Sequence, residues 1–194
     1  NIVDELEPLI TAYGIAAFGD DCDEFNGNLE VASQTCKEII RRKLDIPWRT
    51  QVRAYPLPDD FVRLISASGC WQVHMGIESG NEETLRGIGK HITLQQVEDG
   101  CRILRKYNIE VVGMFMLYNV WEEDGSLCFE DTRKTKQTMK YALKLHKEGL
   151  INQCMWGPTN PYPGSKLFEI ARRHNLIKET LLDDWEAWRR DELY

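Results

Sequence analysis

The sequence predicts an α/β fold built on a parallel sheet, and two observations carry this prediction. Short apolar stretches alternate five times with amphipathic stretches of helical spacing, which is the pattern of βαβ units. The stretch WQVHMGIESG (71–80) is apolar on one face of a strand and polar on the other, without the Lys and Glu of a solvated face. That distribution is typical of a barrel strand that packs under helices, lines a polar cavity and ends in chemistry at its carboxyl end. A strand that merely ends in a polar turn is the alternative.

The sequence of the N-terminal third of the chain predicts two helices and two strands. Apolar residues three and four apart indicate a helix over 1–13, which Gly14 ends, as glycine often does. A short apolar strand over 15–18 follows. The same helical spacing returns over 29–44, and a second strand occupies 48–54.

The middle of the chain predicts two further helices around the strand 71–78. Proline and two acids open a helix over 58–69, where the first turn favours both. Thr93 and Gln96 have the spacing of a capping box, so a helix is expected from there to about residue 107.

The last part of the chain repeats the alternation. The most apolar strand is expected at 110–118, a long helix at 131–149, a fifth strand at 153–158 and a helix at 165–174. Right-handed crossovers bring the carboxyl ends of all parallel strands to one edge. That edge therefore collects the polar groups that follow each strand: Asp20, Asp21, Arg53, Glu78, Ser79, the residues near 116–119 and the loop 161–164.

Composition narrows the class of protein. The chain is 42% hydrophobic and 28% charged, with a formal net charge of −7, which is ordinary for a globular domain. The charge and the lack of a Lys/Arg-rich run argue against a nucleic-acid partner. No apolar run approaches the roughly 20 residues of a membrane span. No signal-peptide pattern is visible, so a cytoplasmic location is expected. Because the chain begins at Asn1 in a helix-like pattern, we expect it to be a segment of a longer protein.

The six cysteines show no metal-binding spacing. The closest two, Cys22 and Cys36, are 14 positions apart, so neither CxxC nor CxxxC occurs, and no local metal or cluster site is predicted. Each cysteine lies in or beside an apolar run. This indicates small, mostly buried thiols in a reducing compartment.

Five stretches carry a resemblance to a known family. They are FGDDCDEF (18–25), WRTQVRA (48–54), GCWQVHMGIESGNEETLRGIGKHIT (69–93), VVGMFMLYN (111–119) and NPYPGSKLFEIA (160–171). Their order and spacing resemble the radical S-adenosylmethionine (SAM) enzymes. The resemblance is greatest to the class that often has a cobalamin-binding domain upstream, of the anaerobic magnesium-protoporphyrin IX monomethyl ester oxidative cyclase type. The 69–93 block is the most specific of the five.

The resemblance implies a partial TIM-like (β/α)6 barrel, here about five parallel βα units with the first strand missing. It also implies a [4Fe–4S] cluster held by a CxxxCxxC loop, and reductive cleavage of SAM to a 5′-deoxyadenosyl radical that abstracts hydrogen from substrate. That loop is absent from this sequence. We therefore expect the cluster cysteines upstream of Asn1, a barrel core over 1–175, a helical tail over 176–194, and no activity from the segment alone.

One departure concerns the loop after the strand 110–118. The family commonly has Gly and then Pro-Gly-Glu-Thr there, whereas this chain has the bulkier, more acidic Tyr-Asn-Val-Trp-Glu-Glu-Asp at 118–124. The resemblance therefore says least about the residues that form that edge of the implied cofactor pocket.

The resemblance implies SAM as cofactor, and residue chemistry then suggests a binding set: Glu78, Ser79, Gly80, Arg53, Asp21, Met116 and Leu117. Glu78 can accept hydrogen bonds from the ammonium or the ribose, and Arg53 can grip the carboxylate with two parallel bonds. The alternatives are that Glu78 caps the following turn, that Arg53 pairs with Glu78 or Asp21, and that Met116 and Leu117 only fill the core.

A second set is expected to face the substrate: Asp20, Gln51, His74 and Tyr162. Asp20 and Asp21 are adjacent and point to opposite sides, so at most one of them faces the cavity. His74 is expected to be a hydrogen-bonded interior residue and not a metal ligand, because no second ligand lies at a recognisable spacing.

The function expected from this resemblance is that of a radical SAM oxidoreductase core acting on a small or tetrapyrrole-like molecule, with cobalamin as an optional cofactor of an upstream domain. A methylthiotransferase of the same superfamily and a non-catalytic scaffold that has lost its cluster are the alternatives. If the first strand is missing, an exposed sheet edge also favours self-association.

Overall fold

The structure is a computed structural model that describes residues 2–20 and 22–177. The predicted role of Asp21 and the predicted helical tail therefore lie outside the described residues, apart from the first two residues of the tail.

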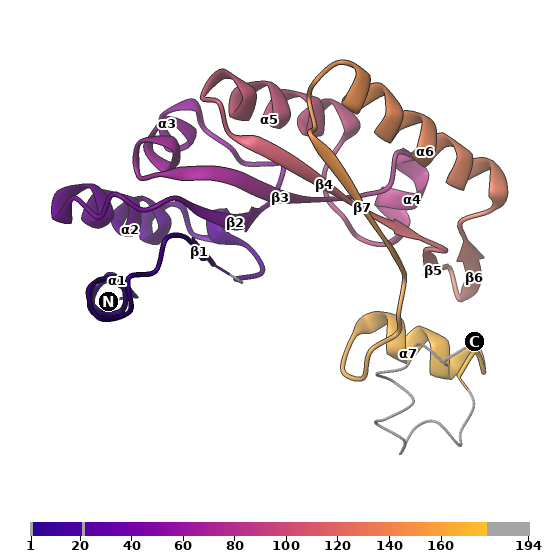
Figure 1. Cartoon of the computed structure of the whole chain (residues 1–194). Helices are drawn as coiled ribbons and strands as arrows, with labels where there is room; N and C mark the ends of the chain where they lie inside the picture. Colours follow the sequence, from indigo (N-terminus) through magenta and orange to yellow (C-terminus); the bar gives the residue numbers. More distant parts are fainter. Residues whose placement is uncertain (1, 21, 178–194) are drawn as a thin grey trace.

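Five strands form one sheet in the order β1-β2-β3-β4-β7: Phe18–Gly19, Trp48–Val52, Cys70–Glu78, Glu110–Leu117 and Gln153–Pro158. All four neighbouring pairs are parallel, so the carboxyl ends lie at one edge. The sheet is strongly curved (Figure 1). The predicted parallel α/β arrangement, with its five strands in this order, is confirmed.

The helices follow the expected alternation: α1 (Ile2–Tyr13), α2 (Leu29–Arg42), α3 (Asp59–Ala67), α4 (Glu82–Gly87), α5 (Leu94–Lys106), α6 (Thr132–Lys147) and α7 (Lys166–Arg173), with a 3-10 turn η1 (Phe25–Gly27). The predicted capping box is present, since Thr93 accepts from the Gln96 amide and Gln96 from the Thr93 amide. Helices α3, α5 and α6 lie along one side of the sheet, and α7 lies beyond the end of β7 (Figure 1). In the described part of the chain no helix is long and apolar enough to cross a bilayer.

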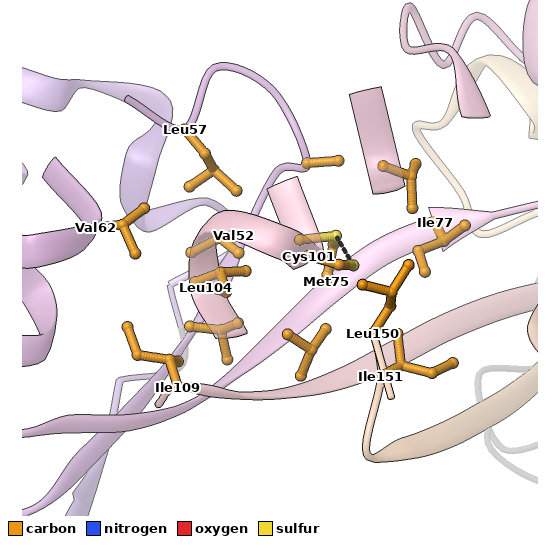
Figure 2. Close-up of a cluster of buried hydrophobic side chains, with 14 of the residues drawn as sticks. Val52, Leu57, Val62, Met75, Ile77, Cys101, Leu104, Ile109, Leu150 and Ile151 are labelled. Carbon is orange, nitrogen blue, oxygen red and sulfur yellow. Dashed lines mark hydrogen bonds between the residues drawn. The ribbon is translucent and has the colours of Figure 1, made fainter. Parts of the chain in front are cut away.

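The core lies between the sheet and these helices. Val73, Met75 and Ile77 of β3 are fully buried there. Figure 2 shows Met75 and Ile77 in one cluster with Cys101 and Leu104 of α5. The Cys101 thiol lies 3.9 Å from the Met75 sulfur. Every second residue of β3 thus contacts helices, as the sequence predicts.

The opposite face of the sheet is the inner, concave one. Gln51 pairs in register with His74, and His74 with Val112, and paired residues of parallel strands share a face. Gln72 and Gly76 are buried on this face of β3, whereas His74 and Glu78 are partly exposed. The prediction that β3 has an apolar outer face and a polar inner face is confirmed.

Three features of the chain differ from the sequence prediction. Strand β1 begins at Phe18 and not at residue 15. Helix α4 is short and was not predicted, because its six residues contain one buried apolar side chain, Leu85. The acidic loop after β4 is an antiparallel hairpin, β5 (Val120–Glu123) and β6 (Ser126–Phe129).

Candidate functional site

Strand β3 ends in a bulge that turns Glu78 toward the concave side of the sheet edge. Glu78 has a φ of 66°, a left-handed conformation that is uncommon for a residue with a side chain. The register with β4 slips between Gly76 and Glu78. Such strained positions often mark functional loops, and this one holds the residue that the sequence singles out.

Glu78 forms an ion pair with Lys90. The Lys90 ammonium lies 3.1 Å from Glu78 Oε1, and the two side chains are 25% and 22% exposed. Lys90 follows α4, where its amide donates to the Leu85 carbonyl at 2.9 Å. Sequence reasoning quoted Lys90 as part of the 69–93 block but gave it no role. Its place 12 residues after Glu78 in that block is the signal that could have found it.

Gly76 makes room for this pair. A Cβ at Gly76 would lie 2.8 Å from Glu78 Oε1 and 3.0 Å from Lys90 Nζ, closer than side-chain atoms normally approach. The charged heads of both residues therefore lie over the bare backbone of Gly76. A glycine two positions before the carboxylate is required for the observed geometry.

Glu78 also lines a pocket of about 210 Å³. Its other walls include Met116 at the end of β4, Ile88 after α4, Trp121 of the hairpin, Thr159 after β7 and Lys166 of α7. The ends of three neighbouring strands therefore meet one cavity, which combines apolar walls with the carboxylates of Glu78 and Glu122 and the ammonium group of Lys166.

The hairpin and α7 close one side of that pocket. Glu122 of β5 contacts Arg173 Nη1 at 2.5 Å and His174 Nε2 at 2.8 Å. The hydrogen bond with His174, and then that with Arg173, holds the pKa of Glu122 below its ordinary value. The departure from the family pattern at 118–124 therefore forms a wall of the site.

The other predicted cofactor residues have different surroundings. Ser79 is fully buried, and its hydroxyl lies 2.9 Å from the Thr138 hydroxyl. A Cβ at Gly80 would lie 2.5 Å from Tyr141 Cβ. Both residues therefore pack against α6. Leu117 alternates with Met116 along β4 and is not among the pocket residues, so of this predicted pair only Met116 reaches the cavity.

Asp20 and Arg53 follow β1 and β2, whereas the pocket lies at the ends of β3, β4 and β7. Arg53 follows β2 and pairs with Glu24, with its side chain 54% exposed. Of the two partners expected for Arg53, Glu78 pairs instead with Lys90, and Asp21 lies outside the described residues. Asp20 accepts a hydrogen bond from Thr50 at 3.3 Å. Thr50 alternates with Gln51 and lies on the helix side, so the structure does not place Asp20 on the inner face.

The remaining residues that were expected to face the substrate lie in two different places. Gln51 and His74 are register partners on the inner face, and their contact with a substrate stays a prediction. Tyr162 lies in the loop after β7, is 54% exposed and is not among the pocket residues.

The Cys22 thiol lies beside Asp20, and the rate of its alkylation can be predicted. Burial first, and then the hydrogen bond with Asp20, raises the pKa of Cys22 to about 11. At pH 8 only about one thiol in a thousand is then the reactive thiolate. Alkylation of Cys22, mapped by mass spectrometry, should therefore be slow at pH 8 and still accelerate above pH 10.

The replacement Asp20→Asn is the control for this reactivity. It removes a carboxylate that raises the pKa, so it should speed alkylation at pH 8. A Cys22 rate that levels off below pH 9 in the unmodified protein would contradict the assignment.

No group of three or more His, Cys, Asp or Glu side chains within residues 2–20 and 22–177 is arranged to hold a metal ion. The six cysteines are free thiols, three of them buried. The described residues thus offer no ligand set for an iron–sulfur cluster.

Comparison with known proteins shows the fold and a similarity to one superfamily. A model of the radical SAM superfamily matches residues 34–125. An uncharacterized methyltransferase of Pyrococcus horikoshii is 29% identical over 176 residues, covering 91% of this chain and 36% of the relative. The anaerobic magnesium-protoporphyrin IX monomethyl ester cyclase of Rubrivivax gelatinosus is 22% identical over 170 residues, covering 87% and 28%.

Solved structures agree on the fold. The radical SAM methyltransferase TsrM of Kitasatospora setae, with cobalamin and a [4Fe–4S] cluster bound, superposes with a TM-score of 0.72. It is 21% identical, with 91% of this chain and 34% of that chain covered. The cobalamin-dependent SAM radical enzyme OxsB gives a TM-score of 0.60 at 17% identity, with 95% and 25% covered. This chain spans about a third of the length of these proteins. Its five parallel strands are the partial barrel of this fold, and residues 34–125 are similar to the radical SAM superfamily.

Proposed function

We propose that this chain is the SAM-binding half-barrel of a radical SAM enzyme of the cobalamin-associated class that acts on a small molecule. One observation carries the proposal. The Glu78–Lys90 pair lies over Gly76 at the carboxyl end of the central strand, beside a pocket lined by Met116. This is the edge of a barrel where enzymes place their chemistry.

The residues at this edge fit SAM by their chemistry. Glu78 is an acceptor whose charge is already balanced by Lys90, so neutral hydroxyl donors of the ribose suit it better than a second cation. Met116 and Ile88 line the pocket with apolar surface, which suits adenine. Arg53 remains the candidate for the carboxylate of SAM, a role in which it would have to exchange its partner Glu24.

When bound, SAM and a reduced cluster supply a radical at the carboxyl edge of the barrel. The residues of this chain bind and orient. Glu78 fixes the ribose, Lys90 holds the Glu78 carboxylate in place, and Trp121 with the hairpin shields the pocket from water. Gln51 and His74 on the inner face then contact the substrate.

Methyl transfer is the second candidate reaction. Among the relatives, the Pyrococcus protein is described as a methyltransferase, as are TsrM and the cytidylyl-2-hydroxyethylphosphonate methyltransferase of Streptomyces wedmorensis. The cyclases support instead a reaction on a tetrapyrrole-like substrate. A methylthiotransferase acting on tRNA has less support, because the net charge of this chain is −7 and tRNA binding needs basic surface.

Incubation of the intact, cluster-reconstituted protein with SAM and a strong reductant tests the proposal. We expect 5′-deoxyadenosine by liquid chromatography and mass spectrometry, and S-adenosylhomocysteine in addition if methyl is transferred. Neither product, together with no measurable SAM binding, would favour the non-catalytic scaffold.

A further inference from the structure

A buried carboxylate outside the pocket connects the strand ends that form it. Glu130 lies between β6 and α6 and is 6% exposed. Its Oε2 accepts from the Asn119 side-chain amide at 2.9 Å and from the Asn119 backbone amide at 3.3 Å. Its Oε1 accepts from the Thr138 hydroxyl at 3.2 Å. Glu130 therefore joins the end of β4 to helix α6.

The same network reaches the loop that carries Glu78. The Thr138 oxygen accepts from the Gly80 amide at 3.1 Å and lies 2.9 Å from the Ser79 hydroxyl. Both the Glu130 carboxylate and the Lys134 carbonyl, each 3.2 Å from the Thr138 hydroxyl, can only accept, so Thr138 donates its one proton to one of these two. Ser79 must then donate to Thr138, and its own oxygen accepts from the Asn81 amide at 3.1 Å. Glu130 is thus one acceptor at the end of a chain of hydrogen bonds that runs through Thr138 to Ser79, Gly80 and Asn81.

A third strand end joins through Asn119. The Asn119 side-chain oxygen accepts from the Thr159 hydroxyl, after β7, at 3.2 Å, and its amide donates to the Met116 carbonyl at 3.1 Å. Asn119, Thr159 and Met116 all line the pocket beside Glu78. One buried carboxylate thus ties together the ends of β3, β4 and β7.

We propose that Glu130 is a positioning residue for the SAM site: through Thr138 and Asn119 it holds the Glu78 loop and the pocket walls in the geometry that binds the cofactor. This inference rests on the proposed function. Burial supports it, because Ser79 and Thr138 are fully buried and Asn119 is 2% exposed. Water is thus largely kept from the groups of the network, and an unmet hydrogen bond there is costly.

The replacement Glu130→Gln tests whether Glu130 must accept hydrogen bonds from both Asn119 and Thr138. A glutamine keeps the shape but places an amide donor against the Asn119 donors or against the Thr138 hydroxyl. Thr138→Val removes the acceptor for Gly80 at nearly constant volume, and Thr138→Ser keeps it. The matched control is Glu98→Gln. Glu98 is another buried carboxylate, 9% exposed, which accepts from Lys144 and Arg102 away from the strand ends.

Two measurements on the intact, cluster-reconstituted protein are needed. Calorimetric titration with SAM should show a dissociation constant raised about tenfold in Glu130→Gln and in Thr138→Val. The double variant should be no worse than either, because both act in one network. Thr138→Ser should stay within about twofold. Hydrogen exchange should show faster exchange at the Gly80 and Asn81 amides in the first two variants. Glu98→Gln should lower the melting temperature without changing the dissociation constant.

The outcomes separate this inference from the function on which it rests. If the unmodified protein binds no SAM, the proposed function fails and the positioning role fails with it. If the unmodified protein binds SAM and Glu130→Gln binds it equally well, only the role of Glu130 is overturned. An equal loss of affinity in Glu98→Gln would also overturn it, since the effect would then reflect general destabilisation.

Discussion

Replacing Gly76 by alanine should weaken SAM binding roughly ten- to a hundredfold and leave the fold intact. The new methyl would lie 2.8 Å from the Glu78 carboxylate and 3.0 Å from the Lys90 ammonium. Both are the ends of flexible side chains, so they can move aside while the backbone stays. The loss corresponds to a charge-assisted hydrogen bond of about 1.5–3 kcal/mol.

A double-variant cycle tests whether Gly76→Ala weakens SAM binding through Glu78. If Gly76 acts through Glu78, Gly76→Ala should cost little further affinity in a protein that already carries Glu78→Gln. Calorimetric titration with SAM measures each affinity, and circular dichroism checks the fold. Additive losses would show that the methyl blocks the cofactor directly, and unchanged affinity in Gly76→Ala would remove the pair from the site.

Trp121→Ala should destabilise the barrel by about 3–5 kcal/mol, the usual cost of truncating a buried aromatic side chain. Trp121 is 3% exposed. It packs against Gly87, where an added Cβ would lie 2.4 Å from its ring atoms. The Lys134 ammonium lies 4.9 Å from the centre of the ring and also 2.7 Å from Glu83 Oε1. Trp121 thus fixes the hairpin to α4 and α6.

Phe129→Ala is the control for Trp121, because Phe129 is an aromatic residue of the same hairpin but is 62% exposed. It should change the free energy of unfolding by no more than about 0.5 kcal/mol. Urea denaturation followed by circular dichroism compares the two. Equal midpoints for the two variants would contradict the view that the hairpin is a packed wall of the pocket.

Regular alternation made most of the fold predictable. The sequence predicted β2, β3, β4 and β7 to within a few residues, because each is a clear apolar run between helical patterns. The inner and outer faces of β3 followed from its alternation alone. Helix α4 and the hairpin were missed because their stabilising contacts are tertiary. Trp121 against Gly87 and Lys134 against Glu83 join segments that sequence periodicity does not relate.

The sequence predicted which residues stand at the strand ends. It predicted less well which face of the sheet each of their side chains lies on. Glu78 and Met116, both chosen from the sequence, line the pocket, and their contact with the cofactor stays a prediction. Asp20 and Leu117 stand at the right edge, but their side chains follow the other face of their strands. Lys90 and Glu130 were assigned no role, because each reaches the site through a loop whose path the sequence pattern does not define.

The most direct test of the account is SAM affinity in Glu78→Gln beside Glu82→Gln. Both replacements remove one negative charge from the same segment, but Glu82 is exposed and does not line the pocket. Calorimetric titration of the intact, reconstituted protein should show affinity lowered roughly ten- to a hundredfold in Glu78→Gln and unchanged in Glu82→Gln. Glu78→Gln that binds SAM as tightly as the unmodified protein would contradict the central claim that Glu78 binds the cofactor.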